Sequence, residues 1–190
     1  MNLLGSKKIE TKRLILRKTE EEDLKKLWEI LKKEEINKYY LTTKINFVWE
    51  KEKKWQYKKL EKASNSDVFC WTIIIRDTNT VIGQISVQEG PVPDVLEIRD
   101  IGWFIDIPYQ RQGYAYEAAN AVLDYMFTDV EIEEIETSAA CVNPGSWKLM
   151  EKLAFKRLDT THFVKYTFVD EPIKVYEYKL VKKDFLNKER

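Results

Sequence analysis

The stretch PYQRQGYAYEAANAVLDYMF, Pro108 to Phe127, joins a sharp turn to a long amphipathic pattern. Its apolar residues recur at helical spacing, at Ala118, Ala119, Val122, Leu123, Met126 and Phe127. A helix that begins near Gly113 has first-turn N–H groups without internal partners, and its dipole adds partial positive charge there. Because Gly113 and Ala115 carry little side chain, a diphosphate can approach these groups closely. The segment predicts a diphosphate-binding turn, although a glycine that only permits a tight strand-to-helix turn accounts for the spacing equally well.

The segments on either side alternate between strand and helix patterns. Helical spacing and charged ends predict helices over 19–33, 47–62 and 143–155, and Thr19 with Glu22 fits a capping box. Alternating or continuous apolar runs predict strands over 13–18, within 67–79, and over 81–88, 95–107 and 131–142, followed by two antiparallel strands around a loop through 185. Gly102 interrupts one strand, which is typical of a β-bulge, and the prolines of Gly90 to Asp94 predict a loop. This order predicts one domain over 1–190, with a mixed sheet and helices on both faces.

Composition narrows the function classes. The 190 residues include 32 basic and 32 acidic side chains, a balance that argues against broad nucleic-acid binding. No stretch approaches the length of a membrane span, and the start of the chain does not resemble a signal peptide. Cys70 and Cys141 lack motif spacing, so we expect reduced thiols in a cytoplasmic protein, with no metal site, membrane partner or nucleic-acid partner.

Two motifs together resemble a known family. The pattern Q-x-x-G-x-A, at Gln110, Gly113 and Ala115, resembles the acetyl-CoA-binding signature of the GNAT acetyltransferase superfamily. The segment NPGSWKLMEKLAF, residues 143–155, is similar to the N-x-x-S-x-x-x-x-x-K-x-G-F segment of its ribosomal-protein N-terminal (alanine) acetyltransferase branch. The opening IETKRLILRKTEEEDLKKLWEI, residues 9–30, is also similar to that branch. The resemblance covers the chain from about Ile9 to about Leu180.

The resemblance implies a GNAT fold and an acetyl-CoA donor. The fold would be an α/β architecture whose mixed, mostly antiparallel sheet splays between strands four and five. Main-chain groups of the turn would hold the pyrophosphate, strand groups would pair with the pantetheine arm, and Ser146 would lie near the sulfur. Arg111 or Lys152 would meet the adenosine phosphates. The residues that the resemblance assigns to acetyl-CoA are Ile105, Ile107, Gln110, Arg111, Gln112, Gly113, Tyr114, Ala115, Tyr116, Asn143 and Ser146.

Simpler roles remain open for two of these residues. Asn143 precedes Pro144, which is the pattern of an N-cap that needs no ligand. Ser146 would equally satisfy a first-turn amide of the same helix.

The implied reaction is direct attack of an amine on the acetyl thioester. Glu97 and Asp100 are the candidate bases, and their spacing of three places them on opposite strand faces. The wider family often has a tyrosine acid seven residues beyond the asparagine; here that position is Met150, so the role falls to Ser146 or water. The acceptor is expected to be a protein N-terminal α-amine, with a small amine or antibiotic as the alternative. A non-catalytic acyl-CoA-binding module also fits, and the chain is expected to act as a monomer or homodimer.

Overall fold

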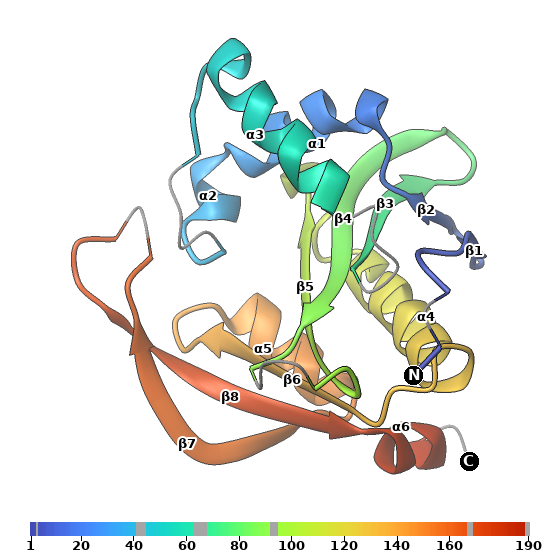
Figure 1. Cartoon of the computed structure of the whole chain (residues 1–190). Coiled ribbons are helices and arrows are strands. Elements are labelled where there is room, and N and C mark those ends of the chain that lie inside the picture. The colour runs from blue at the N-terminus through green and yellow to red at the C-terminus, as the bar shows by residue number, and fades with distance from the viewer. Residues whose placement is uncertain (3, 41–44, 63–67, 92–94, 167–168, 189–190) are drawn as a thin grey trace.

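A computed structural model describes the chain except residues 3, 41–44, 63–67, 92–94, 167–168 and 189–190 (Figure 1). The described residues form one eight-stranded sheet in the order β1-β2-β3-β4-β5-β6-β8-β7. The strands are β1 (Ile9–Glu10), β2 (Leu14–Lys18), β3 (Phe69–Ile75), β4 (Thr80–Glu89), β5 (Ile98–Ile105), β6 (Glu134–Ala140), β7 (Lys156–Val164) and β8 (Ile173–Val181). The α-helices are α1 (Leu24–Leu31), α2 (Glu34–Asn37), α3 (Trp49–Lys62), α4 (Tyr114–Thr128), α5 (Pro144–Lys152) and α6 (Lys182–Lys188), with 3-10 turns at Glu21–Asp23 and Ile107–Tyr109.

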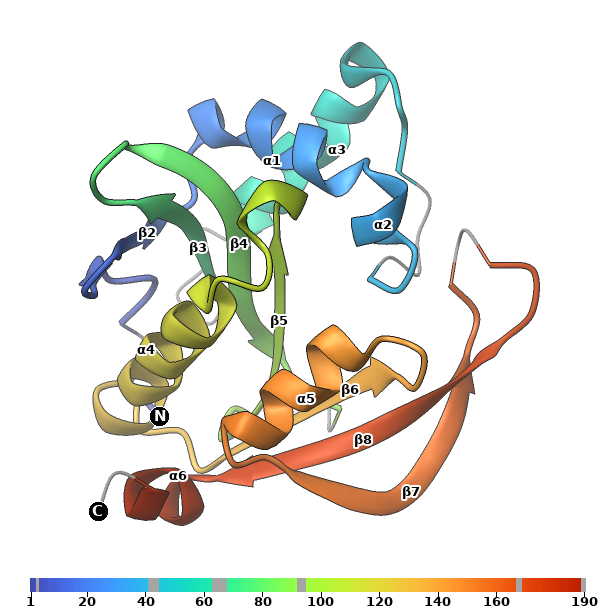
Figure 2. The ribbon, with the colours of Figure 1, turned by 180° about the vertical axis from the view of Figure 1, so that it is seen from behind.

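The sheet is mixed and mostly antiparallel, as predicted. Among the described strands, only the β5–β6 pair runs parallel, and its ladder consists of Ile98 opposite Glu134 and Arg99 opposite Ile135. Beyond these pairs the two strands diverge (Figures 1 and 2), bridged by a 3.0 Å hydrogen bond from Thr137 Oγ1 to the Ile101 carbonyl. The strands that were predicted as the fourth and fifth therefore splay apart, which confirms that feature of the fold.

Helices cover both faces of the sheet. Figure 2 shows α4 and α5 on one face, where Val122 and Met126 of α4 join the main core with Ile85 and Ile101. Residues of α1 form a second cluster with Phe104 on the other face. Across the described part of the chain, no helix has both the length and the apolar sequence that crossing a bilayer requires.

The start of the first helical segment differs from the prediction. The expected capping box of Thr19 and Glu22 is wrong, because the main-chain N–H of Glu20 donates to the Asp23 carboxylate at 2.9 Å instead. Thr19 is buried and accepts a hydrogen bond from the Thr72 hydroxyl at 3.2 Å. Thr19 thus bonds to a strand residue that is distant in the sequence, and the capping box forms one residue later, between Glu20 and Asp23.

The bulge predicted at Gly102 is also wrong. The register between β4 and β5 is continuous, with Gly102 opposite Ser86. A Cβ atom at Gly102 would lie 3.5 Å from the Tyr40 hydroxyl, and the Tyr40 ring packs edge-on against Phe104 at 5.5 Å. Gly102 is therefore part of a regular strand that contacts the Tyr40 side chain, and a Cβ atom at this position would make only an ordinary van der Waals contact.

Candidate functional site

The turn between β5 and α4 is held in shape by its own glutamines. Gln110 Nε2 donates to the Ile105 carbonyl at 2.9 Å, and Gln112 Nε2 donates to the Pro108 carbonyl at 2.8 Å. Arg111 (φ 63°) and Gly113 (φ 84°) both adopt left-handed backbone conformations. Such a conformation costs a non-glycine residue about 1–2 kcal/mol, so the strain at Arg111 must be offset by the surrounding contacts.

This conformation leaves a row of main-chain donors at the front of α4. Within the described residues, the N–H groups of Arg111 to Ala115 have no hydrogen-bond acceptor, whereas the Glu117 N–H donates to the Gly113 carbonyl at 3.0 Å. Tyr116 lies in the same first turn of the helix. The positive end of the helix dipole coincides with these donors. The arrangement is suited to binding an anion such as a diphosphate.

A groove of about 480 Å³ adjoins the turn. Arg13, Gly113, Asn120 and Lys152 contribute to its lining, and the Lys152 ammonium lies 4.3 Å from the centre of the Tyr116 ring. The groove therefore places two cationic side chains beside the row of donors. Lys152 was identified from the sequence as a candidate but Arg13 was not, because Arg13 lies 99 residues before Gln112 of the turn.

The gap between β5 and β6 has main-chain groups along one wall. The N–H of Asp106 donates to the Ile82 carbonyl of β4 at 2.7 Å, whereas the carbonyl of Ile101 faces β6. Because strand groups alternate in direction, the N–H of Ile105 faces the gap. Ile107 differs, since it lies beyond β5, where its N–H donates to Asp106 Oδ1 at 2.8 Å and its carbonyl accepts from the Gln110 N–H. Both of its main-chain groups are used inside the turn.

Asn143 and Ser146 lie at the start of α5, directly after β6. Asn143 occupies the N-cap position, but its side chain makes no capping hydrogen bond. Its carbonyl, not its carboxamide, accepts from the Ser146 N–H at 3.1 Å. Among the described residues, neither the Asn143 carboxamide nor the Ser146 hydroxyl has a hydrogen-bond partner. The capping alternative for Asn143 is therefore not realised, and both side chains are available to a ligand.

The two candidate bases lie in different environments. Strand β5 begins at Ile98, so Glu97 is an exposed turn residue at the end where β5 and β6 are paired. Asp100 lies on the strand, and burial raises the pKa of its carboxyl group, although a hydrogen bond from Gln88 opposes this shift. Asp100 is half-buried, and a carboxyl group with a raised pKa is a better proton acceptor near neutral pH than an ordinary aspartate.

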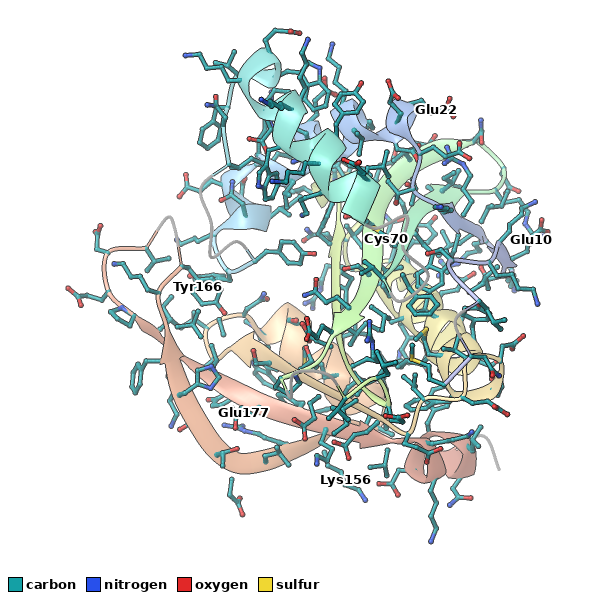
Figure 3. The ribbon with its side chains drawn as sticks, in the orientation of Figure 1. Glu10, Glu22, Cys70, Lys156, Tyr166 and Glu177 are labelled. Carbon is teal, nitrogen blue, oxygen red and sulfur yellow. The ribbon has the colours of Figure 1, made fainter. Side chains whose placement is uncertain are left out.

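Asp100 belongs to a polar row on the face that α1 covers. Ser86 and Cys70 lie on this face, in register with Gly102, and Figure 3 labels Cys70. Burial raises the pKa of the Cys70 thiol, which keeps it protonated and unreactive. Burial likewise raises the pKa of the Tyr40 hydroxyl, which hydrogen-bonds to Ser86. These groups lie on the opposite side of the sheet from α4.

Asn37 is a residue of this face that no sequence pattern singles out. Its side chain is buried, and neither carboxamide atom has a hydrogen-bond partner among the described residues. In the same segment, Lys33 forms an ion pair with Asp106 just after β5, and Tyr40 contacts Gly102 within β5. Asn37 therefore belongs to a segment that packs along the end of β5 at which β5 and β6 are not paired. The four-residue helix α2 that carries it is too short to show a period.

Met150 is buried in the main core and takes no part in the site. The side chain at this position therefore cannot supply the acid role that the resemblance assigns to a tyrosine.

Comparisons with known proteins identify related sequences. The sequence model of the acetyltransferase (GNAT) domain matches residues 13–156. The uncharacterized N-acetyltransferase YnaD of Bacillus subtilis (strain 168) is 30% identical over 149 residues, which cover 78% of this chain and 82% of that protein.

Two solved structures show the same fold. The spermidine N-acetyltransferase of Vibrio cholerae, in complex with CoA and spermine, has a TM-score of 0.78 at 18% identity and covers 93% of this chain and 100% of its own. A ribosomal-protein alanine acetyltransferase of Vibrio fischeri has a TM-score of 0.77 at 16% identity and covers 95% and 99%.

Proposed function

The chain belongs to the GNAT family of acetyltransferases, and we propose that it transfers the acetyl group of acetyl-CoA directly to a protein N-terminal α-amine. The observation that carries this proposal is the row of unbonded main-chain N–H groups from Arg111 to Ala115, located beside the gap between β5 and β6. A diphosphate bound to these N–H groups would direct a pantetheine arm into the gap between β5 and β6.

On the donor side, the diphosphate would accept hydrogen bonds from the turn. Bonds to a charged group are worth about 1.5–3 kcal/mol each, so several of them give firm binding. The pantetheine arm would pair with the Ile105 N–H as an added strand, and the Asn143 carboxamide would reach it from the opposite wall. Ile107 would join only by exchanging its bond to Asp106. Arg111 or Lys152 would meet the adenosine phosphates.

In the reaction, the neutral amine nitrogen attacks the thioester carbonyl carbon. A C–N bond forms, the C–S bond breaks, and the leaving thiolate takes a proton from Ser146 or from water. Once the C–N bond has formed, the nitrogen is positively charged and would lose one proton to Asp100, directly or through water, and an N–H near Ile105 would stabilise the oxyanion. Holding the reactants together supplies roughly 7–11 kcal/mol in well-oriented cases, and a base adds about 10²–10⁴-fold. Glu97 is the weaker candidate base, because it lies outside β5.

The proposed acceptor class rests on how much deprotonation an amine needs from Asp100. An α-amine has a pKa near 7.7–8.0, so roughly a tenth to a fifth is neutral at pH 7, whereas a lysine amine is almost wholly protonated. An α-amine therefore depends less on Asp100 for deprotonation before attack. The alternative is a small cationic amine, which the half-buried carboxyl group of Asp100 also suits and which a spermine-bound structure of the same fold exemplifies.

The test is thiol release from acetyl-CoA across an acceptor panel. We expect turnover with peptides that carry a free α-amine, and none with the same peptides N-acetylated in advance, which serve as the matched control. Faster turnover with a polyamine or an aminoglycoside would assign the small-molecule alternative. Tight CoA binding without turnover on any amine would instead identify a non-catalytic acyl-CoA-binding module.

A further inference from the structure

We propose that Arg13 is a positioning residue for the acetyl donor: paired with Glu117, it fixes the orientation of the peptide group between Gln112 and Gly113, so that the turn presents its N–H groups to the diphosphate. This inference rests on the proposed function, since it concerns the same turn. It adds a residue of the N-terminal strand region that no motif in the turn contains.

The contacts of Arg13 join three parts of the turn. Its Nη1 donates to the Gln112 carbonyl at 2.9 Å, and its Nε donates to Glu117 Oε2 at 2.6 Å. Its guanidinium group also lies 4.4 Å from the centre of the Tyr114 ring. One planar side chain thus contacts the residue before Gly113, the first residue of α4 and the first turn of that helix.

The Gln112 contact determines where the Gly113 N–H points. In a planar trans peptide, the carbonyl oxygen and the following N–H group point in opposite directions. Because Arg13 holds the Gln112 oxygen on its own side, the Gly113 N–H is directed away from Arg13. A glycine in the left-handed conformation is otherwise free to rotate this peptide group. The guanidinium removes that freedom and keeps the donor available before the ligand arrives.

Glu117 provides the fixed end of the contact. Its Oε1 accepts from the Thr11 hydroxyl at 2.7 Å and from the main-chain N–H of Arg13 at 2.8 Å. Burial alone would raise the pKa of Glu117, but these hydrogen bonds and the guanidinium outweigh it and lower the pKa. The carboxylate is therefore charged at neutral pH, and it ties the start of α4 to the segment before β2. Arg13 can then act on Gln112 from a fixed position.

The test compares acetyl-CoA with acetyl-pantetheine, a donor that lacks the diphosphate. For Arg13→Gln we expect kcat/KM with acetyl-CoA to fall about tenfold or more through KM, the loss of one charge-assisted contact. With acetyl-pantetheine we expect a change below about twofold, because no diphosphate is bound. Arg17→Gln is the matched control, since Arg17 lies on β2, four residues after Arg13, and forms an ion pair with Asp23 at 2.6 Å; we expect this variant to preserve the preference for acetyl-CoA.

Arg13→Lys separates positioning from simple charge. Lysine keeps the charge but cannot bond Gln112 and Glu117 together through a planar fork, so we expect it to behave like Arg13→Gln. Full recovery by lysine would overturn the positioning role, as would an equal loss with both donors or an unchanged preference in Arg13→Gln. If the unmodified protein itself showed no preference for acetyl-CoA, the diphosphate site and this inference would both fail.

Discussion

Replacing Gly113 with alanine perturbs the turn at its least tolerant position. The backbone there has φ 84° and ψ 0°, a left-handed conformation in which an added Cβ atom would lie 3.3 Å from Arg13 Nη2 and near no other described atom. The substitution therefore has two separable consequences, one for the stability of the fold and one for donor binding.

The cost to stability should be small. A non-glycine residue in this conformation loses about 1–2 kcal/mol, and the reduced freedom of the unfolded chain returns about 0.4–1 kcal/mol. We expect the free energy of unfolding to fall by about 1 kcal/mol. Donor binding should fall more, because relief of the strain rotates the peptide groups around Gly113. Loss of one charge-assisted bond, about 1.5–3 kcal/mol, would weaken CoA binding about 10- to 150-fold.

Calorimetric titration with CoA, together with urea unfolding, measures both quantities. Gly5→Ala is the matched control, because Gly5 is also left-handed, at φ 66°, and no described atom lies within 4 Å of its Cβ position. The control should lose similar stability and keep CoA affinity. Gly113→Ala with unchanged CoA affinity would refute the diphosphate role of this turn, and an equal loss of affinity in Gly5→Ala would attribute the effect to general destabilisation.

Three further substitutions test the acceptor side and the second wall of the gap. Asp100→Asn should slow turnover by about 100-fold or more. Because the pKa of Asp100 is raised on folding, its stabilising contribution exists below about pH 4 and is lost as pH rises. Urea unfolding should therefore find the variant more stable than the parent at pH 7, and this difference should be smaller at pH 4. Asn143→Ala should raise the KM for acetyl-CoA about two- to tenfold, the worth of a neutral hydrogen bond, with little change in melting temperature, because the side chain does not cap α5. Asn37→Leu should increase the free energy of unfolding by about 1–3 kcal/mol, because it removes a buried carboxamide without a hydrogen-bond partner among the described residues. A lower free energy of unfolding, measured with urea, would mean that this carboxamide is hydrogen-bonded in solution.

Long periodic segments could be predicted from the sequence. The apolar stripe of α4 and the alternation in β3 each reflect burial of one face, which local spacing records. The turn before α4 was also evident, because a glycine directly before a helical pattern is typical of a sharp change in chain direction. The divergence of β5 and β6 came from family resemblance, because no residue pattern encodes the absence of a ladder.

What could not be predicted depends on contacts between distant residues. Arg13 and Glu117 are 104 residues apart, and neither carries a local signal of the ion pair. Gly102 was predicted to be a bulge because a glycine inside a strand pattern often marks one, whereas its pairing with Ser86 on another strand is regular. The short elements β1 and α2 have too few residues to show a period. Tertiary packing, rather than local preference, decides each of these features.

A crystal structure with bound CoA tests the central claim most directly. The account predicts diphosphate oxygens within hydrogen-bond distance of the main-chain N–H groups of Arg111 to Ala115, and the CoA sulfur in the gap between β5 and β6. CoA bound elsewhere, or bound with these N–H groups turned toward protein acceptors, would contradict it.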